Sequence, residues 1–180
     1  MQNIKAIYSD ILNREIRKEN NYEFSVSGNH SMRPLFKQGD ILVLKTSKIG
    51  RGDIIIFRDG DILCCHRVIG IIKSNNKRDY ITKGDYLFYR DKMITEEVVL
   101  GKVIGVKRNG KMTRLDNRFW ETMGKFISLA SLSQNYLSIK RPRNRWNFFV
   151  KKYNLTLLYY YRFFLRLAIP LLYRFNNTLN

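Results

Sequence analysis

The sequence predicts a mainly β domain with flanking helices. Short apolar or alternating runs follow one another between residues 23 and 108, and glycines separate most of these runs. One separation is Asp59-Gly60, a dipeptide that is typical of a tight hairpin. Short strands with turn residues at this spacing indicate a compact, mostly antiparallel sheet.

Helices are expected on both sides of this region. Apolar residues between Ile4 and Ile16 recur at helical spacing, which predicts an amphipathic helix over 3–19. A second helix is expected over 116–138. The expected strands are 23–27, 40–45, 53–58, 61–72, 78–83 and 98–108. The resulting divisions of the chain are an N-terminal amphipathic helix at 1–22, a β domain at 23–112 and a basic, aromatic-rich helical extension at 113–180.

The charge is concentrated in the C-terminal extension. The chain has 33 Lys and Arg against 15 Asp and Glu, a net charge of +18, and no acidic side chain follows Glu121. This excess favours an anionic partner. Aromatic and basic residues interleave over 146–175, which suits either peripheral contact with an anionic membrane or packing against the β domain. Nucleic acid is not favoured as a partner, because no nucleic-acid-binding module accompanies the charge.

The sequence predicts neither a membrane-spanning helix nor a signal peptide. The longest uncharged stretch of the aromatic segment is 153–161, much shorter than the roughly 20 residues that a span needs. The first turns of the chain contain Asp10, Glu15 and Glu19, where a signal peptide has an apolar core. The expected location is therefore the cytoplasm or the periphery of a membrane.

No metal or other cofactor is expected. Cys64 and Cys65 are the only cysteines, and because they are adjacent they exclude a framework of disulfides. Alternation along a strand places Cys64 and His66 on one face and Cys65 on the other. His30 could join the first face, but this spacing matches no standard zinc pattern.

Short polar motifs accompany the predicted strands. They contain residue types that hydrolytic enzymes use. The motifs are Ser31–Pro34 (Ser-Met-Arg-Pro), which follows Gly28 and Asn29; His66–Val68 (His-Arg-Val); and Thr82–Asp85 (Thr-Lys-Gly-Asp), which is followed six residues later by Asp91.

In this order the motifs resemble those of the signal peptidase family of serine proteases, which shares its β-rich fold with the LexA-type self-cleaving repressors. The resemblance covers about residues 24–108. It implies a LexA/signal-peptidase-like β-fold and Ser31 as the nucleophile. It also implies His66 as the general base, as in the archaeal and endoplasmic-reticulum branch, with Asp85 and Asp91 as the acidic residues of the site.

The chemistry of these residue types agrees with that assignment. A serine hydroxyl needs a base within hydrogen-bond reach, and a neutral imidazole can accept its proton and later donate it to the leaving amine. A carboxylate on the other ring nitrogen fixes the imidazole tautomer. We expect Ser31, His66 and Asp91 to be catalytic, with Asp85 in support. Gly28 and Asn29 are expected to form a turn that aims backbone N–H groups at the oxyanion.

Other interpretations of these residues stay open. Asp85 could cap a turn or pair with a nearby cation. Lys83 could act as the base, as in the lysine-dependent branch, provided that burial removes its proton. His30, next to the nucleophile, could compete as the base. The family usually has one residue between the glycine and the nucleophile, whereas two intervene here.

The sequence therefore predicts a serine endopeptidase that cleaves a leader or signal segment from a precursor polypeptide through a Ser31 acyl-enzyme. Members of the family carry a membrane anchor, and none is predicted here, so a soluble precursor is the expected substrate. Two alternatives remain: an inactive peptide-binding module of the same fold, and a membrane- or nucleic-acid-binding protein that acts through its basic C-terminal half.

Overall fold

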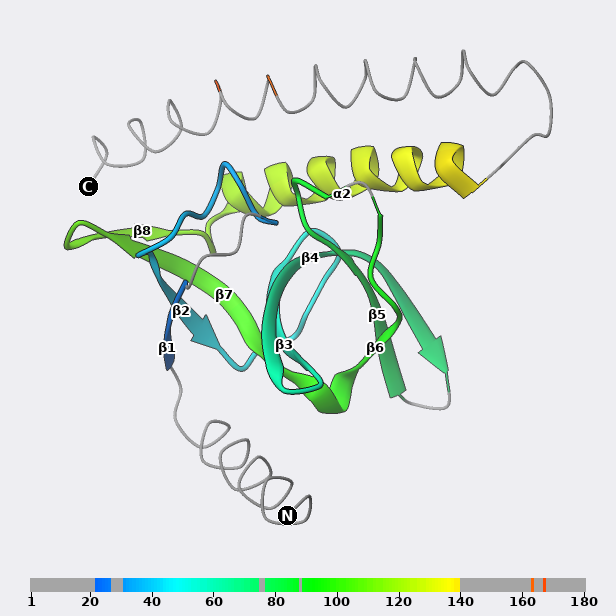
Figure 1. Cartoon of the computed structure of the whole chain (residues 1–180), viewed down its shortest axis with the longest axis horizontal. Coiled ribbons are helices and arrows are strands. Elements are labelled where there is room, and N and C mark those ends of the chain that lie inside the picture. Colours follow the sequence, from blue (N-terminus) through cyan, green and yellow to red (C-terminus); the bar gives the residue numbers. More distant parts are fainter. Residues whose placement is uncertain are drawn as a thin grey trace.

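The computed structural model describes residues 22–26, 31–74, 77–87, 89–139, 163 and 167. Within this part of the chain, one curled sheet forms the body of the protein and a long helix lies across one side of it (Figure 1). The helix predicted at 3–19 lies outside the described residues. So does the aromatic segment at 146–175, apart from Phe163 and Leu167.

The described elements are eight strands, one short 3-10 helix and one α-helix. The strands form a single antiparallel sheet in the order β1-β2-β7-β3-β4-β5-β6, and β8 pairs with β7. In chain order the elements are β1 (Tyr22–Ser25), β2 (Ile41–Lys45), β3 (Ile54–Asp59), β4 (Ile62–Ser74), β5 (Lys77–Lys83), β6 (Ile94–Thr95), η1 (Glu96–Val98), β7 (Val99–Arg108), β8 (Lys111–Arg114) and α2 (Arg118–Ile139).

The mainly antiparallel β architecture expected from the sequence is confirmed. Each of the six predicted strands is present within two residues of its expected bounds, and α2 lies within two residues of the predicted helix at 116–138. The two short strands β6 and β8 were not expected. They extend the sheet beside β5 and β7 respectively.

The hairpin between β3 and β4 turns on Gly60 and Asp61. Asp59 pairs with Ile62, and Gly60 has a φ of 61°. A positive φ at the first loop position alone is the signature of a type II′ turn, which glycine adopts without a steric penalty. The Asp59-Gly60 dipeptide thus marks the hairpin, although the turn itself lies one residue further along.

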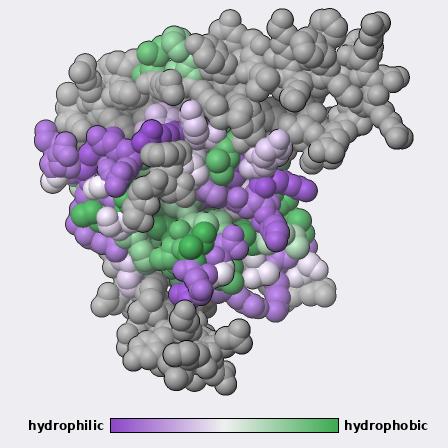
Figure 2. Space-filling model, in the orientation of Figure 1, coloured by the Kyte–Doolittle hydropathy of each residue, from purple (hydrophilic) through white to green (hydrophobic). Residues whose placement is uncertain are grey.

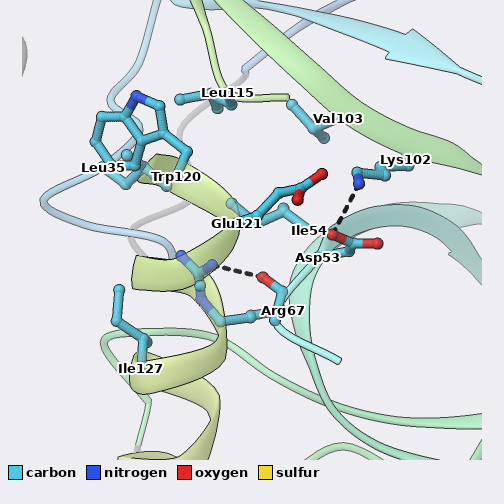
Figure 3. Close-up of a pocket in the computed structure, with 12 residues that line it drawn as sticks. Leu35, Asp53, Ile54, Arg67, Lys102, Val103, Leu115, Trp120, Glu121 and Ile127 are labelled. Atoms are coloured by element: carbon cyan, nitrogen blue, oxygen red, sulfur yellow. Dashed lines mark hydrogen bonds and ion pairs between the residues drawn. The ribbon is translucent and has the colours of Figure 1, made fainter. Parts of the chain in front are cut away.

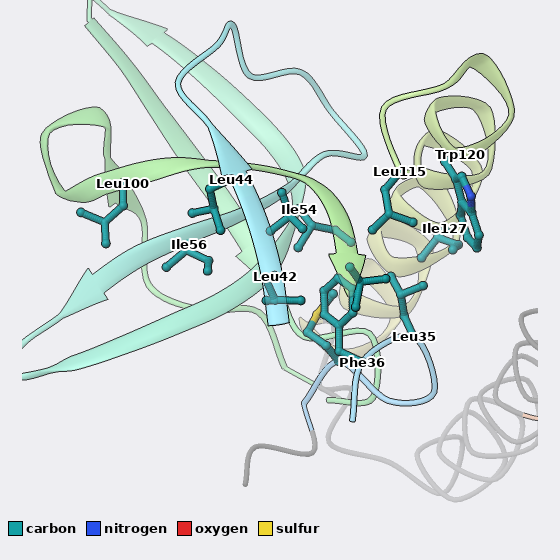
Figure 4. Close-up of a cluster of buried hydrophobic side chains, with 13 residues drawn as sticks. Leu35, Phe36, Leu42, Leu44, Ile54, Ile56, Leu100, Leu115, Trp120 and Ile127 are labelled. Carbon is teal, nitrogen blue, oxygen red and sulfur yellow. The ribbon is translucent and has the colours of Figure 1, made fainter. Parts of the chain in front are cut away.

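β3 is buried on both of its faces. Ile54 and Ile56 belong to one apolar cluster, whereas Ile55 and Phe57 belong to another. Its place between β7 and β4 explains why β3 is a continuous apolar run and does not alternate. The first cluster fills the space between the sheet and α2 (Figure 4) and consists of Met32, Leu35, Phe36, Leu42, Leu44, Ile54, Ile56, Leu100, Val103, Val106, Leu115, Trp120 and Ile127.

Two glycines let α2 come close to the loop before β3. A Cβ atom added at Gly124 would lie 2.5 Å from the carbonyl oxygen of Gly52. A Cβ atom added at Gly52, which has a φ of 94°, would lie 2.5 Å from the carbonyl carbon of Gly124. Further along the helix, the buried Ser128 hydroxyl donates to the carbonyl of Ile69 on β4 (3.3 Å). α2 is therefore held against the sheet by close main-chain contact with Gly52 as well as by its apolar face.

Gly124→Ala is expected to lower the free energy of unfolding. Alanine favours a helix over glycine by about 1 kcal/mol, but the added methyl group must push Gly52 away, and overpacking of this kind costs about 1–3 kcal/mol. The difference is about 0–2 kcal/mol, and we expect a net loss of about 1 kcal/mol, measured by urea unfolding. Gly50→Ala is the matched control, because a Cβ atom there meets only the Asp53 carboxylate at 3.6 Å. A Gly124→Ala protein as stable as the wild type would contradict the close contact.

Candidate active site

β4 separates the candidate site residues onto its two faces. Cys64 packs against the cluster that contains Phe57, and Cys65 packs against the cluster under α2, as strand alternation predicts. His66 shares the face of Cys64, and Arg67 shares the face of Cys65. His66 and Arg67 therefore lie in different environments, and each side chain pairs with a different aspartate.

His66 forms a hydrogen bond with Asp91. The distance from His66 Nδ1 to Asp91 Oδ2 is 2.6 Å. The imidazole is buried, and its ring meets the edge of Phe57 with the centroids 6.0 Å apart. Because an ionised carboxylate only accepts hydrogen bonds, Nδ1 is the donor. Nε2 is then left as the basic nitrogen, and among the described residues it has no hydrogen-bond partner.

Asp91 is held in place by Thr82. The Thr82 hydroxyl donates to Asp91 Oδ2 at 2.6 Å, and the Asp91 backbone N–H donates to the Thr82 carbonyl at 2.8 Å. Thr82 is on β5 opposite Val68, so it lies on the same face of the sheet as His66. Sequence reasoning did not assign Thr82 a role, because only the register of β5 on β4 places it on the His66 face.

Ser31 lies against the turn that follows β5. Its carbonyl accepts a hydrogen bond from the Tyr86 N–H at 2.8 Å. A Cβ atom added at Gly84 would lie 2.9 Å from the Ser31 Cβ. Gly84 is therefore the residue that admits Ser31 to this position. The next residue, Met32, is buried in the cluster under α2 and anchors the Ser31 turn to the core.

One short segment thus brings Ser31 and the histidine–aspartate pair into the same region. Ser31 contacts Gly84 and Tyr86, while Thr82 holds Asp91, which in turn binds His66. Two residues of extended chain, the separation of Thr82 and Gly84, span only about 7 Å.

Asp85 pairs with Arg67. Both of its carboxylate oxygens accept hydrogen bonds from the guanidinium, at 2.8 and 2.7 Å, and both side chains are almost completely buried. The guanidinium also donates to the carbonyl of Gly52 at 2.8 Å, in the small pocket beside α2 (Figure 3). In this structure the Asp85 carboxylate therefore contacts Arg67, and Asp91 alone of the two aspartates contacts His66.

The remaining candidate residues are Gly28, Asn29, His30 and Lys83. Gly28 and Asn29, expected to shape the oxyanion turn, lie outside the described residues, as does His30. Lys83 is almost completely buried and is the Cα partner of Arg67 across β4 and β5. Paired residues share a face, so Lys83 lies on the face opposite to His66.

The two cysteines are unsuited to act as nucleophiles. Burial raises the pKa of the Cys64 thiol, and the nearby carboxylates of Asp59 and Asp91 raise it further. Burial also raises the pKa of the Cys65 thiol, with Asp85 acting in the same direction. The reactive species of cysteine is the thiolate, which these surroundings disfavour. In the described part of the chain, no group of three or more His, Cys, Asp and Glu side chains is arranged to hold a metal ion.

Apolar side chains are exposed in the chain segments that carry His66 and Asp91. Figure 2 shows apolar surface gathered in the centre of the described β domain, with polar residues around it. Ile62 and Leu63 are exposed at the start of β4, a few residues before His66. Leu87, Tyr89 and Met93 are exposed in the segment that carries Asp91. Within the described residues, no helix combines the length and apolar character that crossing a membrane requires.

Comparisons with protein-family models, with curated proteins and with solved structures found no match. The described residues show a mainly antiparallel β protein with one α-helix lying on its sheet. They also show the buried His66 hydrogen-bonded to the partly exposed Asp91, which lies in the segment that contacts Ser31.

Proposed function

We propose that this protein is a serine endopeptidase that removes a leader or signal segment from a precursor polypeptide. The hydrogen bond between His66 Nδ1 and Asp91 Oδ2 carries the proposal. A buried imidazole fixed by a carboxylate at Nδ1, with Nε2 left to accept a proton, is the arrangement that general-base catalysis requires. Ser31, which contacts the same β5–β6 segment, is the nucleophile.

The reaction follows from these roles. Ser31 Oγ attacks the carbonyl carbon of the scissile peptide bond while His66 Nε2 takes the hydroxyl proton. The C–N bond then breaks, and His66 returns the proton to the leaving amine, which leaves an ester on Ser31. A water molecule then hydrolyses the ester by the same proton transfers. This step regenerates the Ser31 hydroxyl and releases the new carboxylate. Asp91 stabilises the imidazolium in both halves of the reaction.

We further propose that the β domain has the LexA/signal-peptidase-like fold. Support comes from the order of the motifs along the chain and from their placement in the structure. Ser31 starts the turn before β2, His66 lies on β4, and Asp85 and Asp91 lie in the segment between β5 and β6. The exposed apolar side chains beside Asp91 suit a substrate that presents an apolar stretch near the cleavage site.

Ser31→Ala is expected to abolish a set of protein N-termini in cells. The N-termini of all cellular proteins are compared between cells with the wild-type protein and cells with the variant, at matched expression. Alanine removes the nucleophilic oxygen, so termini made by this protein vanish, and the sequences that flank them identify the substrate class. Ser47→Ala, at an exposed serine in the β2–β3 loop, is the matched control and keeps these termini.

Identical sets of N-termini in the wild type and in Ser31→Ala would contradict the proposed activity. The peptide-binding and membrane- or nucleic-acid-binding alternatives would then lead. Removal of residues 141–180 separates these two, since a peptide-binding β domain keeps its ligand without the basic chain, whereas a protein that acts through that chain loses binding.

A further inference from the structure

Asp91 depends on another element for its orientation. It lies in the segment between β5 and β6, outside both strands, and its side chain is 22% exposed. A carboxylate in such a segment can rotate and can exchange its partners for water. In this structure two donors meet at one of its oxygens: His66 Nδ1 and Thr82 Oγ1 both lie 2.6 Å from Asp91 Oδ2.

Thr82 is well placed to restrict that rotation. It is completely buried, and its main chain is fixed in β5 by pairing with Val68 on β4. A β-branched side chain in a strand has few χ1 rotamers, so the position of the hydroxyl is set by the sheet. Thr82 also accepts the Asp91 backbone N–H, so the same residue holds Asp91 by its main chain and by its side chain.

We propose that Thr82 is a positioning residue for the catalytic pair. Its hydroxyl holds Asp91 Oδ2 where that oxygen accepts a hydrogen bond from the His66 Nδ1–H, and this keeps the imidazole in the tautomer whose Nε2 is basic. Thr82 does not touch the reacting atoms; it acts through Asp91 and then through His66. The catalytic consequence rests on the proposed endopeptidase function, whereas the effect on the tautomer does not.

The effect on the tautomer is measured first, by nitrogen NMR of histidine in the full-length protein. The chain has only two histidines, so His30→Gln assigns the signals of His66. At alkaline pH the wild type is expected to show a protonated Nδ1 and a bare Nε2. Thr82→Val keeps the β-branched shape and removes the hydroxyl, and it is expected to give a mixture of the two tautomers. Thr82→Ser, which retains a hydroxyl, restores the wild-type signals.

Thr113→Val is the matched control for this experiment. Thr113 is also a buried threonine in a strand, but it lies on β8 opposite Val106. Among the residues that the structure describes, the side-chain hydrogen bonds of Asp91 come from His66 and Thr82, and none comes from Thr113. Its replacement tests whether loss of any buried hydroxyl disturbs His66. We expect the His66 signals of this variant to match those of the wild type. If Thr113→Val shifts the tautomer as much as Thr82→Val does, the positioning role is overturned.

The second measurement is the cleavage of a peptide that spans a site found by the N-terminal comparison. Thr82→Val is expected to lower kcat about tenfold, the lower end of the range for partners that orient an active-site group. KM stays within twofold, because substrate contacts are intact, and Thr82→Ser recovers most of the rate. Unchanged tautomer and unchanged kcat in Thr82→Val would overturn the positioning role and leave the endopeptidase proposal standing. A shifted tautomer in a protein with no peptidase activity would support the positioning of His66 and reject the endopeptidase proposal.

Discussion

Under the proposed endopeptidase mechanism, Asp91→Asn is expected to lower kcat about 10⁴-fold, as the loss of the aspartate charge does in the Ser-His-Asp triad. The physical reason is the direction of the hydrogen bond. The amide oxygen of asparagine can still accept from the Thr82 hydroxyl, which turns the amide NH₂ toward His66. The NH₂ group donates to Nδ1, so the ring proton moves to Nε2. His66 then presents a donor to Ser31 where catalysis needs an acceptor.

The measurement is kcat for the peptide that the N-terminal comparison identifies. Asp61→Asn is the matched control, since Asp61 is an exposed aspartate in the β3–β4 turn, and it is expected to keep the wild-type rate. Circular dichroism of both variants checks that the sheet is intact. A folded Asp91→Asn protein with kcat within a few-fold of the wild type would show that Asp91 does not govern the base.

Asp85→Asn is expected to lower the free energy of unfolding by about 3–5 kcal/mol, the usual result of breaking a buried ion pair. Neutral asparagine leaves the guanidinium of Arg67 buried without its counter-charge, and it can accept only one of the two hydrogen bonds that Asp85 accepts. Urea unfolding of the wild type and the variant measures the difference. The size of the loss distinguishes a buried structural pair from a carboxylate that serves the chemistry alone.

Two further variants make this test specific to the pair. Glu97→Gln breaks an ion pair with Lys77 in which both side chains are exposed, and it is expected to leave the unfolding midpoint unchanged. The double variant Arg67→Met/Asp85→Leu removes both charges and is expected to recover most of the loss, because no buried charge is left unpaired. An Asp85→Asn protein with the same free energy of unfolding as the wild type would show that Arg67 does not depend on Asp85 for its stabilisation.

The strands of the sheet were predictable because most of them are apolar runs. Ile54–Phe57 is apolar throughout since both faces of β3 are covered, and such a run is recognisable without knowledge of its partners. β8 escaped prediction because Lys111–Arg114 is short, polar and largely exposed. Its available signal was the preceding dipeptide: Asn109 and Gly110 have φ values of 51° and 75°, the type I′ turn that this pair favours.

The candidate site was predictable as a set of residues but not as a set of contacts. Strand alternation sends His66 and Arg67 to opposite faces, so two different partners follow. The family resemblance favours Asp91 beside His66, where the structure has it, but it leaves the partner of Arg67 open. That choice depends on the path of the segment after β5, where Asp85 turns toward Arg67 and Asp91 returns to the Thr82 carbonyl. Thr82 is not a residue type usual in catalysis, and only its hydrogen bond with Asp91 supports the positioning role that we propose for it.

The seating of α2 determines how far the protein can be shortened from its C-terminus. Trp120 and Ile127 complete the apolar cluster that also contains Met32, the neighbour of Ser31. A chain that stops at the end of the sheet loses these side chains and exposes Met32 and the apolar residues around it to water. A shortened protein for crystallisation or for isotope labelling should therefore extend through α2, at least past the buried Ser131. An affinity tag belongs beyond that point.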